Sequence, residues 1–137
     1  MESDVFASAD PRLVFVAIQS GDLDASVRFY RLLGIDLHPA DNDAPGDPWI
    51  GGRHAEYSWT DGAYLHLALF DRTSEPTTRV QIGFDVRDLI ALHDRLTTEG
   101  ADVIHPPRRE PWGITARYRD PDGNIVGLTE SNRAILA

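Results

Sequence analysis

Residues 13–38 read LVFVAIQSGDLDASVRFYRLLGIDLH, and residues 79–104, which lie 66 positions later, read RVQIGFDVRDLIALHDRLTTEGADVI. The two stretches agree in residue type and often in identity, as at Asp22 and Asp88 or at Gly34 and Gly100. A second match, at an offset of 61, aligns Asp61-Gly62 with Asp122-Gly123. A repeat of fixed period indicates two copies of one supersecondary unit that bury a shared core.

Each copy predicts a strand, a helix and three further strands. In the first copy we expect strands over 13–18, 35–37, 54–60 and 63–70, a helix capped by Asp22 and ended by Gly34, a loop over 39–52, and a hairpin at Asp61-Gly62. In the second copy we expect strands over 80–86, 101–104, 114–119 and 125–129, a helix from Asp88 to Gly100, a loop over 105–111 and a turn over 120–124.

The repeat predicts an α+β fold in which two tandem βαβββ modules form a cup-shaped mixed sheet with the helices outside. We expect a single domain over residues 1–137, with module 1 at about 12–70, a linker at 71–78, module 2 at about 79–130 and a C-terminal tail at 131–137. Two joined sheets would bury a pocket, which is where ligands usually bind.

Composition excludes several classes of function. The chain has no cysteine, so disulfides and zinc–thiolate sites are excluded. Its 22 acidic residues against 13 Lys and Arg give a net charge of −9, which argues against nucleic-acid binding and is compatible with a cationic ligand. No apolar run approaches the ~20 residues of a membrane helix, and the N-terminus lacks a signal peptide, so we expect a cytoplasmic protein.

Several motifs together resemble one known group. These are Phe15 to Ile18, Asp22-Leu23, Phe29-Tyr30, Leu33-Gly34, Pro111-Trp112-Gly113 and Asp120-Pro121-Asp122-Gly123-Asn124. With the duplication, they resemble the vicinal oxygen chelate superfamily, which includes glyoxalase I, extradiol dioxygenases, fosfomycin-resistance transferases and bleomycin-resistance proteins. The resemblance spans about residues 12–130.

The resemblance implies four positions at which metal-dependent members carry ligands, and these fall on Phe15, His66, Gln81 and Gly127. The repeat supports the same mapping, since 15 and 81 differ by 66 and 66 and 127 differ by 61. Phe15 and Gly127 offer no ligand atom, whereas a catalytic zinc site takes three protein ligands. The sequence therefore predicts no metal and no cofactor at these positions. His54 and Glu56 share a strand face, but a third ligand beside them cannot be named.

Aromatic and polar residues around the expected cup are the candidate ligand-binding side chains. They are Phe15, Trp49, Trp59, Tyr64, His66, Gln81, Trp112 and Tyr118. Aromatic side chains offer large, stiff surfaces to planar ligands. For His66 a buried, internally bonded histidine competes with a polar anchor or acid–base group.

The resemblance is greatest to the metal-free, bleomycin-resistance-like members, which implies a homodimer that sequesters a small molecule. The leading interpretation is metal-independent binding of a mid-sized, partly aromatic molecule, neutral or cationic, which favours a binding protein over an enzyme. A metal-free isomerase, cyclase or lyase using His66 as its catalytic residue is the alternative. A glyoxalase- or dioxygenase-like metalloenzyme with a displaced site is the second alternative.

Overall fold

The structure is a computed structural model that describes residues 15–42, 52–59, 65–71 and 78–132; for residues 40–42, 52, 65 and 66 it describes the backbone alone. The elements follow in the order β1 (Phe15–Ser20), α2 (Leu23–Leu32), β2 (His38–Asn42), β3 (Gly52–Trp59), β4 (Leu65–Asp71), β5 (Gln81–Asp85), α3 (Leu89–Thr98), β6 (Asp102–Glu110), β7 (Gly113–Arg119) and β8 (Ile125–Ser131).

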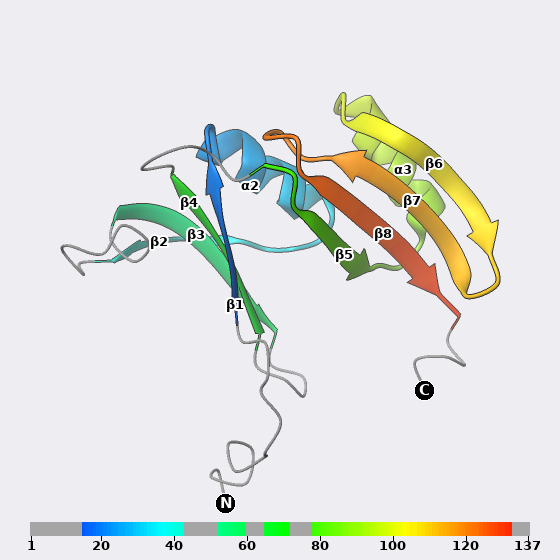
Figure 1. Cartoon of the computed structure of the whole chain (residues 1–137), viewed down its shortest axis with the longest axis horizontal. Coiled ribbons are helices and arrows are strands. Elements are labelled where there is room, and N and C mark those ends of the chain that lie inside the picture. The colour runs from blue at the N-terminus through cyan, green and yellow to red at the C-terminus, as the bar shows by residue number, and fades with distance from the viewer. Residues whose placement is uncertain (1–14, 43–51, 60–64, 72–77, 133–137) are drawn as a thin grey trace, which may run out of the picture.

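The strands form two four-stranded mixed sheets with the same topology, as the repeat predicts. The first has the order β1-β4-β3-β2 and the second the order β5-β8-β7-β6. In each, the first strand of the module runs parallel to the last, and the remaining pairs are antiparallel. The α+β fold with two tandem modules is therefore confirmed. The sheets are separate and splay apart, and α2 and α3 lie on the same side of the molecule (Figure 1).

Both helices begin and end where the sequence predicts. The Asp22 carboxylate accepts a hydrogen bond from Ala25 N at 3.1 Å, and Asp88 caps α3 in the same way through Ala91 N at 3.3 Å. After each helix the chain turns through a glycine with positive φ, 96° at Gly34 and 84° at Gly100. Glycine adopts this left-handed conformation without steric cost, so it ends both helices at defined points.

Each helix buries its apolar stripe against one face of its own sheet. The core is built from Leu23, Phe29 and Tyr30 of α2, from Leu89, Leu92 and Leu96 of α3, and from alternate strand residues that include Ile18, Leu67, Leu69, Ala116, Tyr118, Val126 and Leu128. Because strand side chains alternate between faces, the residues between these point away from the helices.

The β7–β8 turn fastens the second module to α2. The hydroxyl of Tyr30 donates to the buried carboxylate of Asp120 at 2.7 Å. Asp122 accepts from Gly21 N at 2.9 Å and from the Ser26 hydroxyl at 3.2 Å. These contacts cross about a hundred residues of sequence, so the turn joins the two modules as well as two strands.

Three expected boundaries differ from the structure. Residues 35–37 are not a strand: Leu37 N donates to Ile35 O at 2.8 Å, and both side chains turn into the core. The strand comes afterwards, as β2, within the stretch expected as a loop. The tail expected at 131–137 begins later, because Ser131 still belongs to β8.

The loop expected over 105–111 is also wrong, because β6 continues through Pro106 and Pro107 to Glu110. Proline lacks an N–H donor and is tolerated in a sheet mainly on an edge strand or at an irregularity. Strand β6 is the edge of its sheet, and its register shifts between Val103 and His105 and again before Arg108. Both conditions for proline are therefore met.

The Asp61-Gly62 turn, most of the linker and residues 133–137 lie outside the described residues. Strands β3 and β4 on either side of the predicted turn do pair antiparallel. Among the helices that the structure describes, none has the length and apolar character needed to cross a bilayer.

Candidate functional site

The open faces of the two sheets are the surfaces that point away from α2 and α3. On β1, Ile18 packs in the core, whereas Phe15 lies on the open face with 60% of its side chain exposed. Phe15 pairs directly with His66, which in turn pairs with Ser58, so these three positions share one face. The structure thus places two of the predicted site positions side by side.

On the second sheet, Gln81 is exposed on the open face. Its partner on β8 is Ile125, and Gly127 pairs instead with Gly83. The position that corresponds to His66 by strand pairing is therefore Ile125, and the expected equivalence of His66 with Gly127 is wrong by two residues. The repeat aligns the two Asp-Gly turns, but strand pairing places the partner of Gln81 two residues closer to the β7–β8 turn than this alignment indicates.

This correction leaves the chemistry of the four positions unchanged. Neither Gly127 nor Ile125 carries a ligand atom, and the Phe15 side chain carries none either. Gln81 offers one neutral carbonyl oxygen and His66 one imidazole, which falls short of the three protein ligands of a catalytic zinc site. The residues at these four positions therefore do not fit the metal ion that metal-dependent proteins of the vicinal oxygen chelate superfamily hold.

His54 and Glu56 form a second polar group on the open face of the first sheet. His54 is 5% exposed, stacks on Phe70 with ring centroids 4.7 Å apart, and lies 3.2 Å from Glu56 Oε1 through Nε2. His38 pairs with Glu56 across the strands but points its imidazole toward Asp36, at 3.9 Å. Among residues 15–42, 52–59, 65–71 and 78–132, no three His, Cys, Asp or Glu side chains converge as a metal group.

Two predicted ligand residues point toward the helices instead. Tyr118 is fully buried, and its hydroxyl lies 2.8 Å from His93 Nδ1 on α3. Burial raises the pKa of Tyr118 to about 12. Trp59 packs against Tyr57 and Phe84, with ring centroids 4.8 Å and 6.2 Å away. The structure therefore does not bring these two residues together with Phe15 and Gln81.

The remaining candidates are divided between an exposed turn and the undescribed part of the chain. Trp112 lies in the β6–β7 turn and is 51% exposed. Trp49 and Tyr64 lie outside the described residues, as does the side chain of His66.

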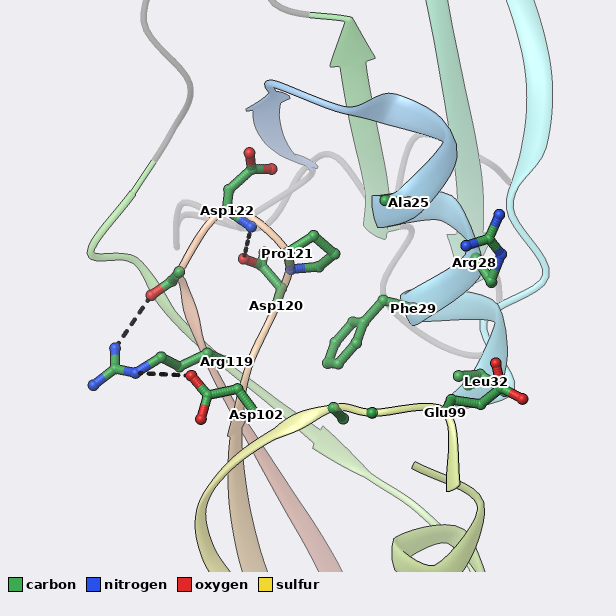
Figure 2. A pocket seen from close by; sticks show the side chains of 13 residues that line it. Ala25, Arg28, Phe29, Leu32, Glu99, Asp102, Arg119, Asp120, Pro121 and Asp122 are labelled. Carbon is green, nitrogen blue, oxygen red and sulfur yellow. Dashed lines mark hydrogen bonds and ion pairs between the residues drawn. The ribbon is translucent and has the colours of Figure 1, made fainter. Parts of the chain in front are cut away.

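A cleft that the sequence did not indicate lies where the modules meet on the helix side (Figure 2). It has a volume of about 520 Å³, and α2 contributes Phe29 and Leu32 to its wall while the β7–β8 turn contributes Pro121. Charged side chains also line the cleft, and one of them, Arg119, forms an ion pair with Asp102 at 3.7 Å. None of the predicted ligand residues lines this cleft.

A second cleft of about 650 Å³ follows the other side of α2. Two of its arginines are committed: Arg31 donates to Leu37 O at 2.6 Å, and Arg53 pairs with Asp24 and with Asp71. Arg28, which lines both clefts, has no hydrogen bond or ion pair to another described residue. The other arginines of the two clefts therefore serve contacts that hold the strands, the modules and α2 in place.

Sequence reasoning missed one cation on the open face of the second sheet. Arg117 is exposed between the buried Ala116 and Tyr118, and no hydrogen bond or ion pair joins it to another residue in the described part of the chain. Strand alternation places Arg117 on the opposite face from Tyr118, but it does not say which of the two faces is the open one. Its neighbour across to β8 is Gly127.

Comparison with known proteins agrees with this arrangement. The sequence model of the Glyoxalase/Bleomycin resistance protein/Dioxygenase superfamily matches residues 12–128. The chain belongs to this superfamily. A curated relative, the uncharacterized protein YetH of Bacillus subtilis (strain 168), is 24% identical over 82 residues, which cover 55% of this chain and 68% of YetH.

Two solved structures of the superfamily resemble the chain along most of its length. TnmS3, an antibiotic binding protein from Streptomyces sp. CB03234, is 25% identical, with a TM-score of 0.66 and coverage of 91% of this chain and 99% of TnmS3. A glyoxalase/bleomycin resistance protein from the same organism is 27% identical, with a TM-score of 0.61 and coverage of 87% and 100%.

Proposed function

We propose that this chain binds a mid-sized, partly aromatic small molecule on the open faces of its sheets, without a metal ion and without changing the molecule. The observation that carries the proposal is Phe15, a 60% exposed aromatic residue beside His66 at a position where metal-dependent members hold a ligand. An exposed phenyl ring on the open face of a sheet favours an apolar, planar guest. The likeness to an antibiotic binding protein supports the same class of function.

Sequestration in the cytoplasm as a homodimer completes the proposal. Each open face is a single wall, and small-molecule sites bury most of the surface of their ligand. A second copy can supply the opposite wall, and the exposed Phe15 and Trp112 are apolar surface available for it. Light scattering at micromolar concentration should give twice the chain mass, and the mass of a single chain would contradict the dimer.

The binding proposal is tested with naphthalene-2-carboxamide, an uncharged planar probe, by isothermal titration calorimetry. Phe15→Ala should weaken binding about tenfold, because it removes the aromatic contact surface. Ile90→Ala is the matched control, since Ile90 is similarly exposed, at 53%, but lies on α3. Equal effects of the two substitutions, or no binding to the unmodified chain, would contradict the proposal.

Mass spectrometry of the recovered probe separates binding from catalysis. A binding protein returns the carboxamide unchanged, and His66→Ala should alter affinity only modestly. If His66 acts as an acid or base in an isomerase, cyclase or lyase, a substrate of that enzyme is consumed and His66→Ala abolishes its turnover.

A further inference from the structure

The open face of the second sheet contains a strip without side chains, which we call the glycine strip. Gly83 on β5 and Gly127 on β8 pair directly across the two strands. Glycine in a strand interior weakens the strand and often marks a place where a ligand or another backbone approaches closely. Two glycines side by side weaken both of the neighbouring strands at the same point.

The backbone does not explain these glycines. Positive φ occurs at Gly34, Gly100, Gly113 and Gly123, but at neither residue of the strip. A Cβ added at Gly83 would come no closer than 3.8 Å to the neighbouring Gly127 O, and one at Gly127 would lie 4.0 Å from Ile82 O. Both distances are ordinary contacts, so a Cβ at either position would fit the fold. What the glycines provide is a flat, uncovered stretch of backbone.

The strip has defined borders. Along the strands it ends at Gln81 and Ile125 on one side and at Asp85 and Thr129 on the other. These bordering rows are four residues apart, or about 13 Å. Across the strands, the residue next to Gly127 is Arg117, which places its Cα about 10 Å from Gly83, or two strand spacings. A planar ring system lying on the strip would meet this guanidinium at one end.

Arg117 differs from its charged neighbours in having no partner within the described residues. Arg119 pairs with Asp102 and Arg108 with Glu110. The Asp85 carboxylate accepts from Ser131 N at 3.2 Å. A guanidinium without a carboxylate, beside bare backbone, is suited to a planar anionic group because it presents several donors in a fixed plane.

We propose that the small molecule is planar and acidic, with its rings lying on the glycine strip and its carboxylate or phenolate against Arg117. The inference rests on the proposed function and narrows its ligand class. It also reverses the sign of charge that the net charge of −9 suggests. A bound ligand interacts more strongly with charges a few ångströms away than with the distant charges that make up the net charge of the molecule, because salt screens the distant ones.

Three naphthalenes that share one ring system but differ in charge test the inference. They are 2-naphthoate, naphthalene-2-carboxamide and 2-naphthylmethylammonium, titrated by calorimetry with amide chemical shifts of Gly83 and Gly127 followed in parallel. The naphthoate should bind about tenfold tighter than the carboxamide, as expected for a charge-assisted hydrogen bond. Arg117→Gln should remove that preference and leave carboxamide affinity unchanged.

Arg95→Gln is the matched control, because Arg95 lies on α3, on the other side of the same sheet, and loses the same charge. Gly127→Val should weaken all three probes at least tenfold at unchanged melting temperature, since valine suits a strand and fills the strip. Gly83→Val provides the same test on β5.

The outcomes separate the two proposals. Binding of all three probes with an acid preference that survives Arg117→Gln, or with a preference for the ammonium, overturns this inference and leaves the proposed function standing. Failure of every probe to bind the unmodified chain overturns both. Binding that Gly127→Val and Gly83→Val leave intact shows that the rings lie elsewhere and also overturns the inference.

Discussion

Among the described residues, Tyr118 and Tyr30 are the tyrosines that are fully buried. Burial raises the pKa of Tyr118 to about 12, and burial together with the nearby Asp120 raises the pKa of Tyr30 well above its usual range. Both hydroxyls are held by hydrogen bonds, to His93 and to Asp120. These residues are therefore structural, although Tyr118 is a reasonable ligand candidate from sequence alone.

The raised pKa values predict a loss of stability at alkaline pH. Above about pH 10 the unfolded chain releases the tyrosine protons while the folded chain retains them, so the free energy of unfolding falls as pH rises. The fall for Tyr118 runs from about pH 10 to about pH 12, at about 1.4 kcal/mol per pH unit for each proton. Urea unfolding at pH 9, 10 and 11 measures it.

Tyr118→Phe should reduce the slope of this pH dependence by about one proton. Tyr57→Phe is the control, because Tyr57 is only half-buried in β3. An unchanged slope in Tyr118→Phe would contradict the assignment of this effect to burial.

The sequence predicts the helices well, but it fails where a strand contains proline and where the register of a strand pair decides a position. The repeat predicts both helices and their glycine ends, because caps and helical spacing are local properties. It fails at β6, where edge position and irregular register allow Pro106 and Pro107 within a strand. It also misplaces the site position on β8, because the repeat indicates Gly127 whereas strand pairing sets Ile125 beside Gln81.

The candidate site shows the same division. The resemblance and the repeat single out Phe15 and His66, and β1 and β4 pair these two residues directly. It cannot say which face of β3 and β7 meets a helix, so Trp59 and Tyr118 were grouped with the pocket although they pack on the helix side. Arg117 and the glycine strip were missed because their meaning depends on strand pairing rather than on residue type.

The contact between α2 and the β7–β8 turn makes a prediction about the two modules. Tyr30→Phe removes the donor that reaches Asp120 at 2.7 Å, while Asn124 still bonds the same carboxylate at 3.0 Å. Hydrogen bonds to charged groups contribute about 1.5–3 kcal/mol, so the free energy of unfolding in urea should fall by that amount. Tyr57→Phe, which keeps this contact, should cost less than half as much; equal losses would contradict the role of the contact.

At the scale of the whole molecule, duplication gives two sheets with the same topology but different open faces. The first presents Phe15 and the His54–Glu56 pair, and the second presents the glycine strip and Arg117. One open face thus carries an exposed aromatic ring and a polar pair, and the other carries a flat stretch of backbone beside a cation. This difference between the two open faces suits a ligand with a ring system and one charged end. The four positions that correspond to metal ligands offer too few ligand atoms for a catalytic metal site.

Binding without a metal ion can be tested in a single set of titrations. Binding of 2-naphthoate should be measured by calorimetry on protein dialysed against EDTA and, in parallel, on protein dialysed against Zn²⁺, Ni²⁺, Mn²⁺ and Fe²⁺. We expect the same dissociation constant for 2-naphthoate in every sample, and less than about 0.1 metal ion per chain by elemental analysis. The reason is that the residues at the four positions that correspond to metal ligands in other members of the superfamily supply fewer ligand atoms than a catalytic metal site requires. Near-stoichiometric metal, with binding that EDTA abolishes, would contradict it.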